Sequence, residues 1–303
     1  LGGLSRMDAP LAGQVGQDVP DELARRLAGA AVPGQAEALL TVVRHLHALV
    51  REMRPSQGDL RSAIGFLTDV GHHADARRQE WVLLADVIGV STLVEDLNAM
   101  RPPEATPNTV AGPFYRADAP DVPNGANLSR DRRGEPLAVT GRVTDCAGAP
   151  LAGALVEVWQ ANGEGLYENQ EPDRQPEFNL RGRLTTDAEG RFWYASVKPK
   201  GYRLPEDGPV GRLANRLGYR LERPAHLHFR VTAPGYETLT THIFDRDDPA
   251  IGLDALFGVK PALLAAFLPE KTAGGAPLWS VDVALVLAAG HVLPHTPKAG
   301  ATE

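Results

Sequence analysis

A proline-rich segment near residue 105 constrains the fold most, because the sequence pattern differs on its two sides. Residues Arg101–Pro107 read RPPEATP, and proline lacks a backbone donor and restricts the residue before it. Before this segment, from about Asp21 to Met100, apolar residues recur every three or four positions, as between Leu39 and Val50. This spacing predicts helices. After the segment, short β-rich runs alternate with turn residues, which is typical of an antiparallel sandwich or barrel.

The expected elements follow from these two patterns. The helical region contains helices over Leu60–Val70 and from Arg77 toward Asn98, with breaks at Gly71 and Gly89. A further helix is expected over Leu256–Phe267 and a loose tail after Pro294. The expected strands are Leu137–Thr144, Ala154–Gln160, Gly182–Thr185, Arg191–Val197, Ala225–Thr232, Leu239–Phe244 and Val281–Leu287.

The predicted fold class is mixed and mainly β, with an antiparallel β-sandwich catalytic domain after an α-helical N-terminal domain. We place a helical domain at residues 7–105, the sandwich at 106–290 and a tail at 291–303. The native protein is expected to start at Met7, because residues 1–6 lack the basic start and apolar stretch of a signal peptide.

Charge, cysteine content and hydropathy exclude several functional classes. The formal charge of −7 gives no general attraction to a phosphate backbone, so nucleic acid is not an expected partner. A single cysteine, Cys146, excludes an intramolecular disulfide scaffold and favours a cytoplasmic location. The longest apolar run, near Val283–Ala289, is far shorter than the roughly 20 residues of a membrane-spanning helix.

Two histidines in one predicted strand form the sharpest local feature. In the segment RPAHLHF, His226 and His228 are two residues apart, so both point to the same face while Leu227 and Phe229 point to the other. Such a pair could hold a metal ion, although a lone pair of this kind is more often solvated or hydrogen-bonded within the protein.

Two tyrosines in loops after strands strengthen the metal interpretation. Tyr167 follows the segment NGEGL, and Tyr202 follows Lys200-Gly201. Two phenols and two imidazoles, with no thiolate, suit a hard trivalent ion such as Fe(III) better than zinc. Either tyrosine alone could simply lie on the edge of the sandwich with its hydroxyl in water.

An ordered set of motifs resembles the intradiol ring-cleaving dioxygenases, and the similarity extends from about Leu39 to Phe267. The motifs are Pro107–Tyr115, Val156–Ala161, Gly165–Tyr167, Gly201–Pro205 and the His-x-His strand. The helical N-terminal region resembles the branch of catechol and hydroxyquinol 1,2-dioxygenases. Three features resemble the hydroxyquinol enzymes: Leu83–Asp86 ahead of Gly89–Ser91, His242 where catechol enzymes usually carry glutamine, and Asp254–Lys260.

This resemblance implies one Fe(III) per chain, held by Tyr167, Tyr202, His226 and His228. It also implies that Tyr202 is displaced by the substrate and acts as a base, and that His242 lies beside the iron. The implied substrate-binding positions are Leu83, Asp86, Val110, Ala111, Gly112, Pro113, Phe114, Leu204, Pro205, Arg223 and Leu256. Ala111 and Leu256 differ from residues expected in some relatives.

Two of these residues also have independent physical interpretations. A carboxylate at Asp86 could accept a hydrogen bond from a third ring hydroxyl, or it could be an ordinary aspartate on a helix surface. Arg223 could stabilise charge that develops on the opening ring, or it could pair at a sheet edge with Glu222 or another acidic neighbour. Next to the His-x-His strand, we favour the first interpretation of Arg223.

The resulting functional hypothesis is intradiol cleavage of hydroxyquinol (benzene-1,2,4-triol) with O2 to 3-hydroxy-cis,cis-muconate or maleylacetate. The nearest alternative is a catechol or chlorocatechol 1,2-dioxygenase. A different alternative is a non-catalytic β-sandwich binding module, because the segment from Gly141 to Ala154 also resembles carboxypeptidase-regulatory-like and transthyretin-like domains. The family resemblance also implies a homodimer formed through the N-terminal helices, with lipid bound there in some relatives.

Overall fold

The computed structural model describes residues 19–75, 78–98 and 101–290, which form two compact units, within residues 1–68 and 69–303. The first unit contains α1 (Val19–Leu27), α2 (Pro33–Met53) and most of α3 (Gln57–His72). Helices α4 (Glu80–Val87) and α5 (Val90–Asn98) belong to the second unit with all the strands. The predicted domain boundary between residues 105 and 106 stays a prediction.

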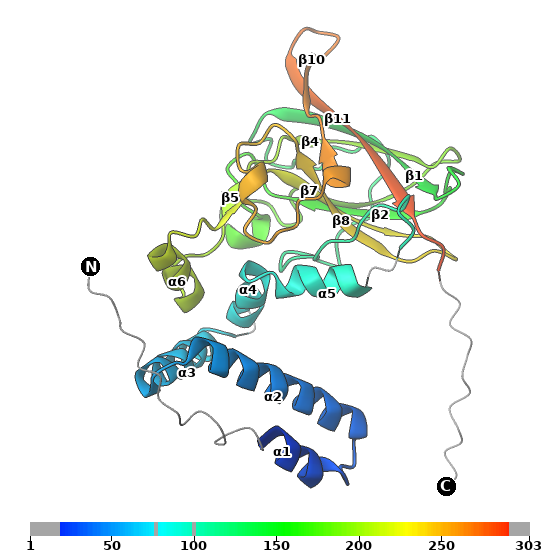
Figure 1. Cartoon of the computed structure of the whole chain (residues 1–303). Coiled ribbons are helices and arrows are strands. Elements are labelled where there is room, and N and C mark those ends of the chain that lie inside the picture. Colours follow the sequence, from blue (N-terminus) through cyan, green and yellow to red (C-terminus); the bar gives the residue numbers. More distant parts are fainter. Residues whose placement is uncertain (1–18, 76–77, 99–100, 291–303) are drawn as a thin grey trace. The chain divides into compact units, whose positions relative to one another are not determined.

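Two sheets build the second unit, and the predicted β-sandwich is confirmed. The four-stranded sheet has the order β10-β11-β1-β4, and the five-stranded sheet has the order β3-β2-β7-β8-β9. The strands of the first sheet are β1 (Pro136–Asp145), β4 (Arg191–Val197), β10 (Leu268–Lys271) and β11 (Pro277–Leu287). Those of the second are β2 (Leu155–Gln160), β3 (Arg181–Thr185), β7 (His226–Thr232), β8 (Leu239–Asp245) and β9 (Leu264–Ala265). Figure 1 shows β10 and β11 as a hairpin that extends beyond the sheets.

The alternation of side chains along β7 separates the core from a second, polar face. Leu227, Phe229 and Val231 are fully buried in the core between the sheets, together with residues from β1, β4 and β11. His226 and His228 alternate with these apolar residues and therefore point to the outer face of the five-stranded sheet. The predicted division of this strand into a histidine face and an apolar face agrees with the structure.

Smaller elements complete the second unit. They are a two-stranded ribbon of β5 (Tyr202–Arg203) and β6 (Glu222–Arg223), helix α6 (Pro209–Leu217) and three 3₁₀ turns. The turns are η1 (Glu168–Gln170), η2 (Ile251–Leu253) and η3 (Pro261–Leu263). Helix α6, whose signals are a proline in its first turn and the left-handed Gly218 after its last residue, was not predicted.

The expected helix over Leu256–Phe267 is wrong. That segment contains only η3 and the two-residue strand β9. Asp254 holds its start as a turn, because its carboxylate accepts the backbone N–H groups of Leu256 at 3.3 Å and Gly258 at 2.8 Å. Phe257 has a φ of 54°, which a right-handed helix does not allow. Leu256, Leu263 and Phe267 are buried although the segment is not a helix.

The other predicted elements occur near their expected positions. Gly89, with a φ of 75°, separates α4 from α5 as expected, whereas Gly71 lies in the last turn of α3. The final strand, β11, begins at Pro277 and thus earlier than predicted. The proposed start at Met7 and the tail after Pro294 fall outside the described residues. None of the helices in the described part of the chain has the length and apolar character needed to cross a membrane.

Candidate active site

One arginine and three aromatic residues form a row across the outer face of the five-stranded sheet. In the strand register, Arg181 of β3 lies opposite Trp159 of β2, and Trp159 lies opposite His228 of β7. His228 in turn lies opposite His242 of β8. The Trp159 ring stacks on the His228 ring, with centroids 4.6 Å apart. The row therefore holds His228 between an aromatic ring and a second imidazole.

Three ligand-type atoms converge at this row. The Nε2 atoms of His226 and His228 are 3.2 Å apart, and the Tyr167 hydroxyl lies 3.0 Å from His228 Nε2. All three side chains are at least 97% buried, since their exposed fractions are 3%, 2% and 1%. The two histidines and Tyr167 therefore present nitrogen and oxygen lone pairs to a common point.

The hydrogen bonds of the two histidines test whether this point suits a cation. The Nδ1 atom of His226 donates to the Pro224 carbonyl at 2.7 Å, which leaves its Nε2 as an acceptor. The Nδ1 atom of His228 is buried and has no hydrogen-bond partner in the described part of the chain. His228 Nδ1 is unsatisfied in either tautomer, and protonation at Nδ1 would also place the two Nε2 lone pairs face to face. A cation between the Nε2 atoms would remove the repulsion, so the donor set fits a metal ion.

The electrostatic environment also favours the ligand form of the histidines. Burial lowers the pKa of His226, His228 and His242, and the charge of Arg223 lowers these pKa values further. All three rings are therefore neutral near pH 7, which is the form that binds metals. Burial raises the pKa of the Tyr167 hydroxyl, so an ionised Tyr167 requires a strong positive charge beside it.

Tyr202 reaches the same point from a different element. It lies in the short ribbon, opposite Arg223 in the strand register. Its ring meets the Tyr167 ring edge-on at a centroid distance of 6.0 Å and lies 5.7 Å from the His226 ring. Tyr202 is only partly buried and lines a cavity, whereas Tyr167 is fully buried and stacked on Phe114 at 4.3 Å. The structure thus brings together all four residues predicted from the sequence as metal ligands.

His242 and Arg223 form a separate hydrogen-bonded chain behind the histidine pair. His242 Nε2 lies 3.5 Å from Arg223 Nη1, and its Nδ1 contacts the Thr109 hydroxyl. Because a guanidinium can only donate, His242 accepts at Nε2 and donates from Nδ1. The three histidines of β7 and β8 form a cluster with ligand atoms within 4.8 Å of one another, but both nitrogens of His242 are engaged outside the convergence point.

Arg223 is a buried cation with a defined partner. Its Nε donates to Asp254 at 3.1 Å, whereas its Nη2 is buried without a hydrogen-bond partner among the described residues. Burial opposes the charge of Arg223, but the Asp254 carboxylate together with Tyr202 and Tyr167 raises the pKa of the guanidinium. The alternative partner, Glu222, instead accepts from Arg220 at 2.7 Å. Glu222 is therefore not the partner of Arg223, whereas the other half of that interpretation, a pairing with another acidic neighbour, agrees with the contact to Asp254.

A cavity of about 500 Å³ opens in front of these groups. Its wall includes Tyr202, Arg223 and His228 and most of the residues predicted to bind substrate. These are Leu83, Asp86, Gly112, Pro113, Phe114, Leu204, Pro205 and Leu256. Val110 lines an adjoining groove that shares Asp86 and Gly112 with the cavity. Ala111 is partly buried between these two neighbours and lines neither space.

Contacts between α4 and α6 position two walls of the cavity. Glu80, at the start of α4, is 1% exposed and accepts the backbone N–H of Val210 in α6 at 3.1 Å. Arg78 bonds to both Glu80 and Asp207. Because Leu83 and Asp86 follow on α4, this connection fixes their helix relative to the chain that carries Leu204. Asp86 is 7% exposed, and its burial raises the pKa of its carboxyl group.

Several residues around the site were not identified from the sequence. Asp254 and Thr109 lie in motifs used for the resemblance, but nothing in their spacing indicates that they hold Arg223 and His242. Arg181 and Glu168 form a buried ion pair beside Tyr167, with Nε and Oε1 2.7 Å apart. Alternation along β3 places Arg181 on the same face as Trp159 once the strand register is known. That register, which the sequence does not give, is the missing signal.

Comparison with known proteins agrees with this arrangement. A family described as "Dioxygenase" matches residues 110–288, and one described as "Catechol dioxygenase N terminus" matches residues 36–106. A hydroxyquinol 1,2-dioxygenase from Rhizobium sp. is 48% identical over 264 residues, which cover 84% of this chain and 90% of the relative. A 6-chlorohydroxyquinol 1,2-dioxygenase from Cupriavidus pinatubonensis is 41% identical over 77% of this chain and 84% of its own length.

The solved structure of a hydroxyquinol 1,2-dioxygenase from Pseudomonas putida DLL-E4 is also similar. The TM-score is 0.85 with 37% sequence identity, and the match covers 90% of this chain and 98% of that chain. Intradiol dioxygenases use iron, which agrees with the chemistry of the donor set. These findings overturn the alternative of a non-catalytic binding module, and they confirm that the chain is an intradiol aromatic ring-cleaving enzyme that belongs to the intradiol ring-cleavage dioxygenase family.

Proposed function

We propose that this enzyme acts on hydroxyquinol. It would cleave the ring between the two adjacent hydroxyl-bearing carbons and incorporate both atoms of O2 to give 3-hydroxy-cis,cis-muconate, the enol form of maleylacetate. One observation carries the proposal. His228 Nε2 lies 3.2 Å from His226 Nε2 and 3.0 Å from the Tyr167 hydroxyl, and this group of atoms lies beside a cavity whose wall includes a buried carboxylate, Asp86. The names of several relatives support the substrate.

The metal of this proposal is one Fe(III) per chain, held by Tyr167, Tyr202, His226 and His228. Two neutral imidazoles and two phenolates match a hard trivalent ion, and its charge would offset the burial that raises the pKa of Tyr167. Iron bound there would act as a Lewis acid that binds both adjacent hydroxyl oxygens and activates the ring toward O2.

The two tyrosines are proposed to have different roles because their environments differ. Tyr167 is buried, stacked on Phe114 and in contact with His228, so it is suited to remain a ligand. Tyr202 is partly exposed in a two-residue strand and lines the cavity. The substrate would displace Tyr202, which would then take up a proton from a substrate hydroxyl.

Two charged residues are proposed to act on different parts of the substrate. The unpartnered Nη2 of Arg223 would stabilise negative charge that develops on the opening ring, and His242 would hold the guanidinium in place. Asp86 would accept a hydrogen bond from the third hydroxyl, which catechol lacks. The remaining proposed wall of the substrate site comprises Leu83, Val110, Ala111, Gly112, Pro113, Phe114, Leu204, Pro205 and Leu256.

We also propose a homodimer formed through the N-terminal helices. Within the helical unit, α2 contains no buried residue, and Leu46, Leu49, Val50 and Met53 are each about half exposed or more along its length. An apolar face of this kind needs a covering partner, and a second copy would provide one with the same chemistry. Sedimentation of the iron-loaded enzyme at micromolar concentration should give the mass of two chains, and a mass of one chain would contradict the dimer.

The role of Tyr202 predicts the effect of removing its hydroxyl. Tyr202→Phe should weaken the visible phenolate-to-iron absorption of the iron-loaded enzyme and lower kcat for hydroxyquinol about 100-fold or more, because a ligand and a base are lost together. The control is Tyr115→Phe, since the Tyr115 hydroxyl binds Glu157 and Arg230 outside the cavity. An unchanged spectrum and rate in Tyr202→Phe would contradict the assignment.

The proposed contact of Asp86 predicts a change in substrate preference. Asp86→Ala should lower the ratio of kcat/KM for hydroxyquinol to kcat/KM for catechol about 10-fold to 100-fold, the value of a hydrogen bond to a charged group. Parallel rate measurements on the two substrates check this. Asp86→Asn, which keeps a hydrogen-bond acceptor, should lie between the wild type and the alanine variant. Equal losses on both substrates would refute the contact, and a wild-type preference for catechol would favour the catechol alternative.

The environment of Arg223 predicts which carboxylate holds it. Asp254→Asn should lower the free energy of unfolding by about 3–5 kcal/mol, because it leaves a buried guanidinium without its counter-charge. Glu222→Gln removes a partly exposed partner of Arg220 and should change stability by less than about 1 kcal/mol. Urea unfolding followed by circular dichroism measures both values. Equal effects of the two substitutions would contradict the assigned pairing.

A further inference from the structure

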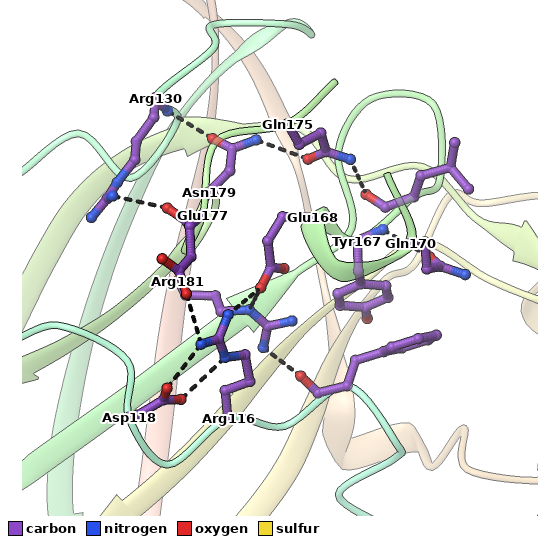
Figure 2. A network of polar contacts seen from close by, with 12 residues as sticks. Arg116, Asp118, Arg130, Tyr167, Glu168, Gln170, Gln175, Glu177, Asn179 and Arg181 are labelled. Carbon is purple, nitrogen blue, oxygen red and sulfur yellow. Dashed lines mark hydrogen bonds and ion pairs between the residues drawn. The ribbon is translucent and has the colours of Figure 1, made fainter. Parts of the chain in front are cut away.

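A buried ion pair lies beside Tyr167, outside the cavity wall. Arg181 and Glu168 are 2% and 4% exposed, and the Nε of Arg181 donates to Oε1 of Glu168 at 2.7 Å. Figure 2 shows the pair next to the Tyr167 ring, with Arg116 on its other side. Glu168 directly follows Tyr167 in the chain and begins the turn η1. The pair therefore acts on the loop that carries the proposed ligand.

Arg181 connects this loop to a second segment that touches Tyr167. Its Nη1 donates to the backbone carbonyl of Phe114, and the Phe114 ring is stacked on the Tyr167 ring at an interplanar angle of 22°. The Arg181 guanidinium also lies 5.9 Å from the centre of the Tyr167 ring. The guanidinium of Arg181 thus contacts the Glu168 side chain, the Phe114 carbonyl and the Tyr167 ring.

The backbone of Arg181 belongs to the same sheet as the histidines. Arg181 lies opposite Trp159, and Trp159 lies opposite His228 and stacks on its ring. Strand pairing fixes these residues relative to one another, whereas Tyr167 lies in a loop. Beside the direct packing of Tyr167 on Trp159 and His228, the ion pair is a polar connection through which the sheet can set the place of the Tyr167 hydroxyl, 3.0 Å from His228 Nε2.

Stability alone does not account for this pair. Desolvating two charges costs about as much as their attraction returns, so a buried ion pair is weak evidence for stabilisation. In this pair, hydrogen bonds offset only part of the desolvation cost, because Arg181 Nη2 and Glu168 Oε2 are buried without hydrogen-bond partners among the described residues. Arg116 adds a second cation 3.6 Å from Glu168. The presence of arginine at position 181 is better explained by its forked guanidinium, which bonds to the Glu168 side chain and to the Phe114 carbonyl at once, than by a gain in stability.

A hydrogen bond at the other end of the turn completes the restraint on Tyr167. Gln170 accepts the backbone N–H of Tyr167 through its side-chain oxygen at 2.9 Å. Tyr202, in contrast, is partly exposed and lies in a ribbon of two short strands. The loop of Tyr167 is thus fixed by side chains on both sides of the ligand.

We propose that Arg181 is a positioning residue for Tyr167, which holds the phenol oxygen at His228 by fastening Glu168 and the Phe114 carbonyl to strand β3. The inference rests on the proposed iron site. It assigns to Arg181 an effect on iron binding and on the Tyr167 phenolate, without contact with substrate. Removing Arg181 should therefore alter the metal site before any substrate is added.

The test compares Arg181→Met and Arg181→Lys with the matched control Arg183→Met. Arg183 is two residues along β3 on the same face, and its partner is the exposed Asp121. Each purified protein would be loaded with Fe(III), its iron affinity measured by competition with a chelator, and its phenolate vibrations recorded by resonance Raman spectroscopy. Melting of the metal-free proteins would report on folding.

Arg181→Met should bind iron about 10-fold to 100-fold more weakly than the wild type, which is the usual loss of metal affinity when a residue that orients a metal ligand is replaced. Its phenolate vibrations should also differ from those of the wild type. Arg181→Lys should keep the melting temperature of the metal-free protein but not the iron affinity, because an ammonium group lacks the fork that reaches both partners. Arg183→Met should match the wild type in both.

The proposal would be overturned if all three variants had the iron affinity and the phenolate vibrations of the wild type. If Arg181→Met does not fold, the lysine variant decides, and wild-type affinity and vibrations in that variant would equally overturn it. A wild-type protein that binds no Fe(III) and shows no visible band would instead refute the proposed function, so the two failures can be told apart.

Discussion

The register of the five-stranded sheet is the constraint on which the rest of the structure depends. It gives strands β2, β3, β7 and β8 two chemically different faces, because side chains alternate along each strand. Leu227 and Phe229 fill the core between the sheets, and the residues between and beside them carry the polar row from Arg181 to His242. A shift of one residue in β7 would exchange these faces and destroy both the core and the site.

Buried charges around the site are arranged so that the histidines stay neutral. Arg223 lies among three buried imidazoles and is balanced by Asp254. Its positive charge lowers the pKa of the imidazoles, which suits them to bind a cation. Burial has the opposite effect on the tyrosine and raises the pKa of the Tyr167 hydroxyl. A trivalent ion at the proposed site would resolve this conflict, because it binds both neutral nitrogens and charged phenolate oxygens.

Much of this architecture could be predicted from the sequence, because strong local patterns determine it. The proline-rich segment after residue 100 separated helical from β-rich sequence, and alternation in the His-x-His strand gave the correct face to His226 and His228. The helix expected at Leu256–Phe267 failed because Asp254 and the left-handed Phe257 fix a turn whose bonds come from a side chain. The partners of Arg223, His242 and Tyr167 depend on strand register and loop closure, which no local pattern encodes.

The proposed centre is a tyrosinate Fe(III) site that would bind hydroxyquinol through two adjacent hydroxyls. The most direct measurement is the visible spectrum of the purified, iron-loaded enzyme under argon, before and after hydroxyquinol or catechol is added, followed by admission of air. We expect a red-purple band that shifts when substrate is added, returns after oxygen uptake and completes this cycle faster with hydroxyquinol than with catechol. A protein that stays colourless and inert after reconstitution with Fe(III) would contradict this proposal.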